Sequence, residues 1–582
     1  MPESLSAAAT APALHWRGIH AGQIKARVAA AALRPRSPRT VVAVLALYLL
    51  LATNWPLWLA LVRIDAAPAF WLPAAFGMAW LLLVGLLALL ALTAWPRAMK
   101  PLWIALAVLA AVVQYYSNTY HMVMDPSMVR NIVYTDPAEA RDLLSWQLLL
   151  QVAVVAGPIA AWLWRVPVAP RGLWPHAWRN AVLFGVALAA AAACVATMSR
   201  TLAPLMRNQP QLRYLMNPLA TVWSASAVAT QPLLSRKKGL AVITPGTALG
   251  PNYASGQRPP LLLLVVGETA RADHFGLNGY ARDTTPRLAA QDVLSWRDVT
   301  SCGTSTLASL PCMFSPLSRT RFEHRNQDSE NLLDVLHAAG LAVLWLDNQS
   351  GGCKGVCARI PHAQVNDADL HPALCDAGDC LDAVLLDGLE QRIAALPPDR
   401  VARGLVVVMH QMGSHGPAYY KRSPPGDKRF LPECRSAVLS DCTQAELVNA
   451  YDNSIAYTDD ILAQAIDWLR ARSRRFDSGL LYLSDHGESL GEYGLYLHGA
   501  PWRIAPQVQK HVPMVAWLNG GLAQRVGLDT GCLRDRLDVP LSHDNLFHTV
   551  LGLLDVHNPS YRLPLDAFAT CRQAAAGNAS LR

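Results

Sequence analysis

Residues 261–269 read Leu-Leu-Leu-Leu-Val-Val-Gly-Glu-Thr, six apolar residues followed at once by a glycine, a carboxylate and a hydroxyl. An unbroken apolar run of this length is typical of a strand buried on both faces, as in a parallel sheet covered by helices. Similar runs occupy 341–346, 405–409 and 480–483, and helical patterns at 331–339 and 450–472 lie between the runs. These patterns predict an α/β domain with a mainly parallel central sheet.

Each of these runs ends in polar residues. In parallel α/β sheets, ligands bind beyond the carboxyl ends of the strands. We therefore expect one site to collect Glu268, His410, Asp485 and His486, which follow three of the runs or end them. Glu268, Asp485 and His486 are ligands that zinc accepts, and three protein ligands leave one position open for a reacting group.

The segment 301–306, Ser-Cys-Gly-Thr-Ser-Thr, offers four hydroxyls for that open position. A metal lowers the pKa of a hydroxyl that it coordinates, which makes the hydroxyl a nucleophile near neutral pH. Thr306 at a helix N-terminus would also favour a phosphate on the same group. Simpler alternatives remain: an Asp-His turn, a Ser/Thr-rich cap, and ordinary surface histidines at His415 and His498.

The first 200 residues are dominated by long apolar stretches. A helix of about 20 apolar residues crosses the hydrocarbon core, and this length predicts five spans, at 41–62, 70–95, 102–116, 146–164 and 181–197. No apolar run precedes residue 41, so the first span is expected to act as an uncleaved anchor and not as a signal peptide.

Basic residues indicate the orientation of these spans. They cluster before the first span and after the second and fourth, a pattern that places those segments in the cytoplasm. With an odd number of spans, the C-terminal half then lies on the opposite side of the membrane. The residues concerned are Arg17, Lys25, Arg27, Arg34, Arg36, Arg39, Arg97, Lys100, Arg165, Arg171 and Arg179.

The cysteines give an independent indication of the compartment. Ten of the eleven follow residue 257, and only Cys194 lies in an apolar run. An even set at loop-sized spacings fits disulfides in an oxidising compartment. A bridge between Cys302 and Cys312 would hold the hydroxyl-rich loop, and the spacing of Cys353 and Cys357 also suits a redox or metal pair. The other three candidate pairs are Cys375 and Cys380, Cys434 and Cys442, and Cys532 and Cys571.

These features predict four regions. They are a cytoplasmic segment at 1–40, a transmembrane domain at 41–200 with an outer-side loop at 117–145, a Pro-punctuated linker with surface helices at 201–257, and a periplasmic catalytic domain at 258–582. The formal net charge is +8, but many basic residues serve as topology signals and 52% of the chain is hydrophobic. We therefore expect contact with the lipid bilayer and no nucleic-acid binding.

A set of short motifs resembles the membrane-bound phosphoethanolamine transferases that modify lipid A, the family that includes the mobile colistin-resistance enzymes. The resemblance extends from the five spans to about residue 520. The matching motifs are Val-Val-Gly-Glu at 265–268, Arg-Ala-Asp-His at 271–274, Asn-Gly-Tyr at 278–280, Arg-Asp-Thr at 282–284, the segment 301–306, Pro-Cys-Met-Phe-Ser at 311–315, Met-His-Gln-Met-Gly-Ser-His-Gly-Pro at 409–417, Tyr-Asp-Asn at 451–453, Thr-Asp-Asp at 458–460, Ser-Asp-His-Gly-Glu-Ser-Leu-Gly-Glu at 484–492 and Leu-His-Gly at 497–499.

The resemblance implies an alkaline-phosphatase or sulfatase-like domain with one zinc ion, and a second zinc as a further possibility. It implies zinc ligands at Glu268, Thr306, Asp485 and His486, with Thr306 as the nucleophile that carries phosphoethanolamine. It assigns Lys354, His415, Glu488 and His498 to the phosphoethanolamine site, with His415, Glu488 and His498 also in catalysis. It assigns the donor head group to Asn131, Thr135 and Glu139.

Asn131, Thr135 and Glu139 have the spacing i, i+4, i+8, which would place all three on one face of a helix. An amphipathic helix lying in the membrane interface is the alternative interpretation of that segment.

The predicted reaction moves phosphoethanolamine from phosphatidylethanolamine to a phosphate of lipid A through a phosphoethanolamine-threonine intermediate, in a protein expected to be monomeric. Resistance to polymyxins and other cationic peptides would follow, because the outer surface would carry less negative charge. The alternatives are transfer to core heptose or another periplasmic glycan, a glycerol-phosphate transferase, a sulfatase, and a catalytically silent sensor or scaffold.

Overall fold

The structure is a computed structural model that describes residues 35–64, 68–95, 97–135, 137–169, 172–234, 239–253, 257–349, 351–376 and 379–573. Residues 1–34 of the predicted cytoplasmic segment therefore lie outside the described residues. Arg171 and the side chain of Glu139 lie outside them too. The chain forms two compact units. One comprises Met1–Thr53, Ala67–Ala111 and Val152–Leu202, and the other comprises Asn54–Ala66, Val112–Gln151 and Ala203–Arg582.

Long apolar helices make up most of the first unit and part of the second. In the described part of the chain, four helices are long and apolar enough to cross a membrane, or five if the bent pair α2 and α3 forms one span. The second count agrees with the five predicted spans. These helices are α2 (Pro38–Ala52), α3 (Trp55–Val62), α4 (Pro68–Thr93), α5 (Met99–Thr119), α8 (Trp146–Arg165) and α9 (Leu173–Asn208).

Two short helices, α6 (Pro126–Tyr134) and α7 (Pro137–Asp142), lie between α5 and α8. The prediction of one continuous helix through Asn131, Thr135 and Glu139 is wrong. Thr135 is extended, with φ −69° and ψ 137°, and it ends α6. Pro137 disfavours helical geometry in the residue before it, which favours a helix boundary at this point of the sequence.

Helix α10 (Leu219–Leu234) and a 3₁₀ turn at Pro210–Leu215 occupy the predicted linker. The helix packs against α6 in the second unit, and the hydroxyl of Ser224 on α10 donates to the carbonyl of Met124 at 2.8 Å. The outer loop is thereby tied to the chain that leads into the α/β domain.

The centre of the second unit is a seven-stranded sheet with the order β3-β13-β10-β2-β9-β5-β6. The four predicted strands are β2 (Pro260–Gly267), β5 (Ala342–Asp347), β9 (Leu405–His410) and β10 (Asp477–Ser484), all parallel, and β6 (His362–Gln364) extends them. On the other side, β13 (Met514–Leu518) pairs antiparallel with β10, and β3 (Leu294–Trp296) pairs antiparallel with β13 and forms the edge.

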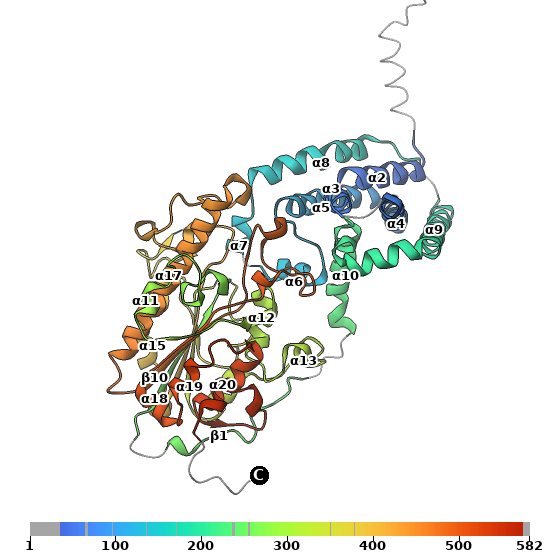
Figure 1. The fold of residues 1–582 in the computed structure, drawn as a ribbon. Coiled ribbons are helices and arrows are strands. Elements are labelled where there is room, and N and C mark those ends of the chain that lie inside the picture. The colour runs from blue at the N-terminus through green and yellow to red at the C-terminus, as the bar shows by residue number, and fades with distance from the viewer. Residues whose placement is uncertain are drawn as a thin grey trace, which may run out of the picture. The chain divides into compact units, whose positions relative to one another are not determined.

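Helices cover both faces of this sheet. Figure 1 shows α17 (Gln444–Arg470) on one side and α12 (Thr306–Met313) and α20 (Leu546–Leu553) on the other. Alternate strand residues such as Leu262, Leu264 and Val266 enter a common core with side chains of α12, α14 and α20. The remaining helices are α11 (Pro286–Ala289), α13 (Arg319–Glu323), α14 (Leu332–Ala338), α15 (Leu389–Ala394), α16 (Pro398–Arg403), α18 (Gly520–Arg525) and α19 (Thr530–Arg534).

Small two-stranded sheets and five disulfides fix the loops around the sheet. The disulfides join Cys302–Cys312, Cys353–Cys357, Cys375–Cys380, Cys434–Cys442 and Cys532–Cys571, and Cys194 is free and buried. The strand pairs are β1 (Ala248–Leu249) with β15 (Val556–His557), β4 (Val299–Thr300) with β14 (Leu541–Ser542), β7 (Cys375–Asp376) with β8 (Asp379–Cys380), and β11 (Ser489–Leu490) with β12 (Tyr496–Leu497).

Candidate active site

The register of β2 and β10 brings the first polar residues of the site together. Ser484 lies opposite Gly267 in this parallel pair, so Glu268 and Asp485 leave the same edge of the sheet side by side. His486 follows directly, and Glu268, Asp485 and His486 are each 0% exposed. A carboxylate pair and an imidazole are thus confined to one buried point at the end of two strands.

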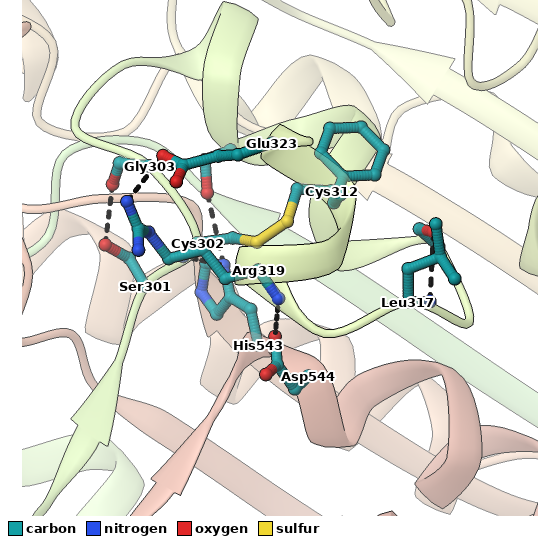
Figure 2. Close-up of a disulfide and its surroundings, with 12 residues drawn as sticks. Ser301, Cys302, Gly303, Cys312, Leu317, Arg319, Glu323, His543 and Asp544 are labelled. Atoms are coloured by element: carbon teal, nitrogen blue, oxygen red, sulfur yellow. Dashed lines mark hydrogen bonds and ion pairs between the residues drawn. A yellow bond between two sulfur atoms is a disulfide. The ribbon is translucent and has the colours of Figure 1, made fainter. Parts of the chain in front are cut away.

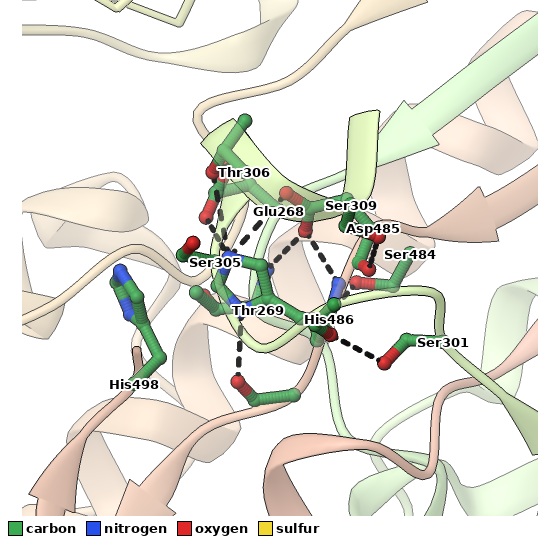
Figure 3. Close-up of polar contacts among 12 residues, drawn as sticks. Glu268, Thr269, Ser301, Ser305, Thr306, Ser309, Ser484, Asp485, His486 and His498 are labelled. Carbon is green, nitrogen blue, oxygen red and sulfur yellow. Dashed lines mark hydrogen bonds and ion pairs between the residues drawn. The ribbon is translucent and has the colours of Figure 1, made fainter. Parts of the chain in front are cut away.

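Thr306 completes a cluster that we call the metal-ligand cluster: Glu268, Thr306, Asp485 and His486. The Thr306 hydroxyl donates to Glu268 Oε2 at 2.9 Å and lies 3.4 Å from His486 Nε2. His486 Nε2 in turn lies 3.3 Å from Glu268 Oε1 and 3.4 Å from Asp485 Oδ2. Figure 3 shows these four side chains converging from β2, α12 and the end of β10.

The cluster has the donor set that a divalent metal requires. Glu268 Oε1 and Asp485 Oδ2 are buried without a hydrogen-bond partner, and buried polar atoms in this state normally have a ligand or water to satisfy them. His486 Nδ1 lies 2.9 Å from the carbonyl of Gly487, and by donating to it the ring leaves Nε2 as the free ligand atom. Glu268, Asp485 and His486 can therefore hold a metal ion together.

The electrostatics of the cluster indicate the same need for a cation. Burial and the charge of Glu268 raise the pKa of Asp485 to about 6. Burial also acts to raise the pKa of Glu268, but the adjacent His486 ring outweighs it and the pKa lies below its usual value. For His486, the two carboxylates overcome burial and raise its pKa to about 10. Positive charge at Nε2 thus relieves the repulsion between two buried carboxylates.

Thr306 is the first residue of α12, and Ser305 before it is extended, with φ −152° and ψ 154°. This change of backbone direction is typical of a helix start and turns the Thr306 side chain toward Glu268. On the other side of the site, Gly413 has φ +52°, and a Cβ there would lie 2.7 Å from the Glu268 carbonyl oxygen. Only glycine leaves room for the segment 409–417 to pass this close to Glu268.

His543, from the C-terminal part of the chain, holds the nucleophile loop in place. Its Nδ1 accepts from the backbone N–H of Cys302 at 3.0 Å and lies 3.1 Å from the Ser309 hydroxyl. Its Nε2 lies 2.9 Å from the carbonyl of Ser484, to which it donates. Figure 2 shows this ring beside the Cys302–Cys312 disulfide. His543 therefore joins the segment before α12 to the end of β10.

Sequence reasoning did not single out His543, and the tail after about residue 520 had no predicted role. The only local signal was a polar triplet, His543 to Asn545, before an apolar helix. Burial lowers the pKa of His543 to about 3, so the ring stays neutral and can accept a hydrogen bond at Nδ1.

His410 was expected in the same cluster but takes a different position. Its Nδ1 lies 3.1 Å from Asp347 Oδ1, on the neighbouring strand β5. In the part of the chain that the structure describes, His410 belongs to neither of the two groups that could hold a metal ion. It is the last residue of β9 and is fully buried, so it supports the strand ends and does not complete the metal-ligand cluster.

A cavity of about 110 Å³ opens on Thr306. Lys354, His415 and His498 line it, as do Asn131 and Thr135 from the outer loop. Asn131 Oδ1 accepts from the Ser305 hydroxyl at 3.2 Å, which places the outer loop directly against the start of α12.

Glu488 is 0% exposed, and its Oε2 lies 3.4 Å from His498 Nδ1. It therefore contacts the site through His498 and is not among the residues that line the cavity.

A second group of potential ligands shares Glu268 with the metal-ligand cluster. Its other members are His415 and His498, whose ring centroids lie 5.3 Å apart. The His498 ring also lies 4.5 Å from the ring of His486. Three imidazoles and two carboxylates thus surround one hydroxyl, an arrangement that suits the binding and transfer of an anionic phosphoryl group.

The fold and the site together define a membrane-anchored transferase or hydrolase of phosphate or sulfate esters with a candidate metal centre. Residues 260–556 match the Sulfatase family, and residues 82–233 match the family Phosphoethanolamine transferase EptA/EptB. Phosphoethanolamine transferase EptA from Salmonella typhimurium is 41% identical over 477 residues, which cover 80% of this chain and 84% of the relative.

Two further comparisons agree. Phosphatidylethanolamine transferase Mcr-1 from Escherichia coli is 37% identical over 481 residues, 80% of this chain and 85% of its own. The integral membrane lipooligosaccharide phosphoethanolamine transferase A (EptA) from Neisseria meningitidis superimposes with a TM-score of 0.85 at 33% identity, covering 92% of this chain and 99% of that structure.

This chain belongs to the lipid A phosphoethanolamine transferase family, as its motifs predicted. It is a multi-pass protein of the bacterial inner membrane with its catalytic domain in the periplasm.

Proposed function

We propose that this enzyme transfers phosphoethanolamine from phosphatidylethanolamine to a phosphate group of lipid A. The observation that carries the proposal is the Thr306 hydroxyl, which lies 2.9 Å from Glu268 Oε2 inside the metal-ligand cluster and opens into a cavity with Lys354, His415 and His498. The relatives named above support the group that is transferred and the membrane location of the substrates.

We further propose zinc as the metal, held by Glu268, Thr306, Asp485 and His486. The mixture of two carboxylates, one imidazole and one hydroxyl is a donor set that zinc accepts. Zinc, when bound, lowers the pKa of a coordinated hydroxyl and offsets negative charge on the phosphoryl oxygens. Glu268, His415 and His498 are the group that would hold a second ion.

In the proposed first step, Thr306 Oγ1 loses its proton to Glu268 Oε2 and forms a bond to the phosphorus of phosphatidylethanolamine. The bond from phosphorus to the glycerol oxygen breaks, and diacylglycerol leaves with a proton. We assign that proton to His498, which the buried Glu488 carboxylate contacts through Nδ1. A carboxylate that orients an imidazole is a common arrangement in acid-base catalysis. Lys354 and His415 bind the phosphoryl oxygens.

In the proposed second step, an oxygen of a lipid A phosphate attacks the phosphoethanolaminyl group on Thr306 from the side opposite Oγ1. A new phosphorus–oxygen bond forms as the acceptor oxygen gives its proton to His498, the bond to Thr306 Oγ1 breaks, and Oγ1 takes back the proton that Glu268 holds. The enzyme is unchanged overall, and diacylglycerol and phosphoethanolamine-modified lipid A are the products. Positioning and electrostatic stabilisation supply most of the rate enhancement in such transfers.

Asn131, Thr135 and Glu139 are proposed to hold the donor head group. Support comes from the contact between Asn131 and Ser305 at the start of α12, and from the presence of Asn131 and Thr135 on the cavity wall. We propose that the enzyme acts as a monomer. We also propose that the catalytic domain begins near residue 258, at the start of β2.

Mass spectrometry of lipid A from cells with and without the enzyme tests this function. We expect a mass increase of one phosphoethanolamine group with the wild-type protein and none with Thr306→Ala. The modified surface would carry less negative charge, so polymyxin would bind it less strongly and the cells would be resistant.

Three results would replace the proposal with one of its alternatives. A modified core heptose or another glycan, with unmodified lipid A, would change the acceptor. Release of free phosphoethanolamine without any acceptor would indicate a hydrolase. A purified protein without bound metal and without transfer would indicate a silent membrane sensor.

A further inference from the structure

A second, larger cavity adjoins the active site and has no role in the reaction as described so far. Its volume is about 710 Å³, against about 110 Å³ for the cavity that opens on Thr306. A volume of several hundred cubic ångströms is typical of sites for drug-sized ligands. Both cavities are lined by Asn131, Tyr134, Ser305, Leu307 and Lys354, so they meet at a common wall beside the nucleophile.

Acidic and basic residues both line the larger cavity, but most of them neutralise one another or are otherwise occupied. Asp328 pairs with Arg325 at 2.9 Å, and Glu323 pairs with Arg319 at 2.5 Å. Arg359 makes two contacts with Asp334, at 2.7 and 2.5 Å. The Glu330 carboxylate accepts from two backbone N–H groups, those of residues 243 and 244, at 2.8 and 3.0 Å.

Arg130 and Lys354 are the exceptions among the charged residues that line the larger cavity. Arg130 donates to the amide oxygen of Gln231 at 3.4 Å, and Lys354 donates to the carbonyl of Tyr134 at 3.5 Å. Both partners are uncharged, and no carboxylate of a described residue forms an ion pair with either cation. Two cations that no described carboxylate neutralises, on the wall of one cavity, attract an anion. Arg130 lines only the larger of the two cavities.

The small cavity and the large one differ in the chemistry they offer. Met122, Ile132 and Leu143 line the small cavity, and such side chains suit the glycerolipid part of a phospholipid. The large cavity instead combines hydroxyl, amide and charged groups with the aromatic ring of Trp502. A phosphorylated sugar matches that mixture, because its hydroxyls need polar partners and its phosphate needs cations.

We propose that the large cavity binds the phosphorylated sugar of the acceptor, with Arg130 and Lys354 directing its phosphate toward Thr306. This inference rests on the proposed function and deepens it. The chemical step is the second displacement given above: an acceptor phosphate oxygen bonds to phosphorus and gives its proton to His498, the bond to Thr306 Oγ1 breaks, and Oγ1 regains its proton from Glu268.

The geometry of the two displacements explains why the cavities meet. Each displacement is in line with Thr306 Oγ1, so the attacking acceptor oxygen enters where the diacylglycerol oxygen left. A space of about 110 Å³ cannot hold both reacting bodies at once. The donor lipid therefore departs before the acceptor phosphate enters the small cavity past Asn131, Ser305 and Lys354. We accordingly expect ping-pong kinetics.

The test separates the two half-reactions in the full-length, metal-loaded enzyme in detergent. The donor half-reaction is followed as diacylglycerol released from phosphatidylethanolamine without acceptor. The complete reaction uses purified lipid A, and glucosamine 1-phosphate serves as a short acceptor. We expect Arg130→Gln to lower kcat/KM for both acceptors by about 10-fold or more, with the donor burst unchanged in rate and amplitude. Arg130→Lys should retain more acceptor activity than Arg130→Gln.

Arg141→Gln is the matched control, because Arg141 is exposed on the same outer loop and lines neither cavity. It should leave both half-reactions at wild-type rates. Thermal unfolding of each variant shows whether it is folded, and Arg130→Lys provides the same comparison if Arg130→Gln is unstable.

Two results would overturn the inference while leaving the proposed function intact. If Arg130→Gln and Arg130→Lys transfer to lipid A like the wild type, the large cavity does not bind the acceptor. If donor release and acceptor transfer fall by the same factor, Arg130 serves the donor. By contrast, the absence of any diacylglycerol burst in the wild-type enzyme would contradict the proposed function itself.

Discussion

The metal-ligand cluster and the outer-loop wall of the active site face the same hydroxyl but are held in different ways. We define the outer-loop wall as Asn131, Tyr134 and Thr135. Glu268, Asp485 and His486 extend from adjacent parallel strands and are fully buried, and Thr306, at the start of α12, is 7% exposed. The outer-loop wall contacts Ser305, next to the nucleophile, and the substrate-binding Lys354 through single hydrogen bonds of 3.2 and 3.5 Å.

This difference indicates a division of labour. Reacting groups must be held to within a fraction of an ångström, and strands and their buried hydrogen bonds provide that precision. A wall that must accept a bulky lipid and then release it needs fewer fixed contacts. We therefore expect substitutions in the cluster to abolish the chemistry and substitutions in the wall to change substrate binding in a graded way.

The largest effect is expected from Asp485→Asn. An uncharged amide removes one of the two carboxylates that attract the metal, so bound metal should be lost and transfer should fall by at least about 1,000-fold. Metal analysis of the purified protein and a lipid A transfer assay measure both. Asp459→Asn is the control, because Asp459 is a buried carboxylate on α17 that accepts from the backbone of Arg287 and Leu288. Wild-type metal content in Asp485→Asn would contradict the ligand assignment.

The next largest effect is expected from His543→Gln, which changes a side chain that supports the metal-ligand cluster without belonging to it. Loss of the Nδ1 acceptor leaves the Cys302 N–H unpaired and frees the nucleophile loop. Substitution of a residue that supports metal ligands typically lowers metal affinity or activity by about 10- to 100-fold. Here we expect kcat to fall while KM for the donor changes little. His548→Gln, a buried histidine of the same segment that accepts from Arg562 N–H, is the matched control. Equal losses in the two variants would show a general effect on folding.

Two disulfides of similar loop length lie at different distances from the nucleophile. Cys302–Cys312 and Cys434–Cys442 close sequence separations of 10 and 8 residues, so replacing either pair by serine should destabilise the fold by a similar 2–3 kcal/mol, roughly. Only the first adjoins the nucleophile loop. We expect its removal to lower kcat by about 10-fold and removal of the second to leave kcat unchanged. Equal kcat values in the two double variants, measured below their unfolding temperatures, would contradict this role.

A smaller, graded effect is expected at the outer-loop wall. Asn131→Ala removes the hydrogen bond to Ser305, and a net contribution of about 0.5–1.5 kcal/mol corresponds to a change of roughly 2- to 10-fold. The change should appear mainly in KM for phosphatidylethanolamine, with metal content unaffected. Ser226→Ala, on the exposed side of α10, should match the wild type. A complete loss of activity in Asn131→Ala would place it with the cluster.

The last effect concerns stability and not activity: it is a pH dependence that His543 gives to the free energy of unfolding and that the outer-loop wall does not affect. Because the folded state lowers the pKa of His543 to about 3, its contribution to stability is fully present above the unfolded-state value near 6.5 and is lost as the pH falls toward 3. The free energy of unfolding should fall by at most about 1.4 kcal/mol per pH unit from this group. His543→Gln should flatten that slope, whereas Asn131→Ala should retain it. Identical slopes in thermal unfolding from pH 7 to pH 4 would contradict this origin.

Much of the fold could be predicted because its central strands are buried on both faces. The runs at 261–266 and 405–409 correspond to β2 and β9 almost residue for residue. The edge strand β3 and its neighbour β13 were not predicted; a three-residue strand such as Leu294–Trp296 carries too little pattern. The outer-loop helix was predicted too long, because the spacing rule was applied across Pro137, which favours a helix boundary before it.

The candidate site, like the fold, was predicted only in part. Glu268, Asp485 and His486 could be found because each follows a recognisable strand, and Thr306 because a hydroxyl-rich loop precedes an apolar helix. His543 could not be found, since its partners are the backbone atoms of Cys302 and Ser484, which lie 241 and 59 residues away in the chain. Long-range support of a loop by a side chain leaves no local pattern in a single sequence.

The claim at the centre of this account is that Thr306 carries the phosphoethanolamine group during transfer. Peptide mass spectrometry of the purified enzyme, incubated with phosphatidylethanolamine and no acceptor, measures this directly. We predict one added phosphoethanolamine group on the peptide that contains Thr306, lost again when lipid A is supplied. An active enzyme whose Thr306 peptide stays unmodified, or whose Thr306→Ala variant still modifies lipid A, would contradict the account.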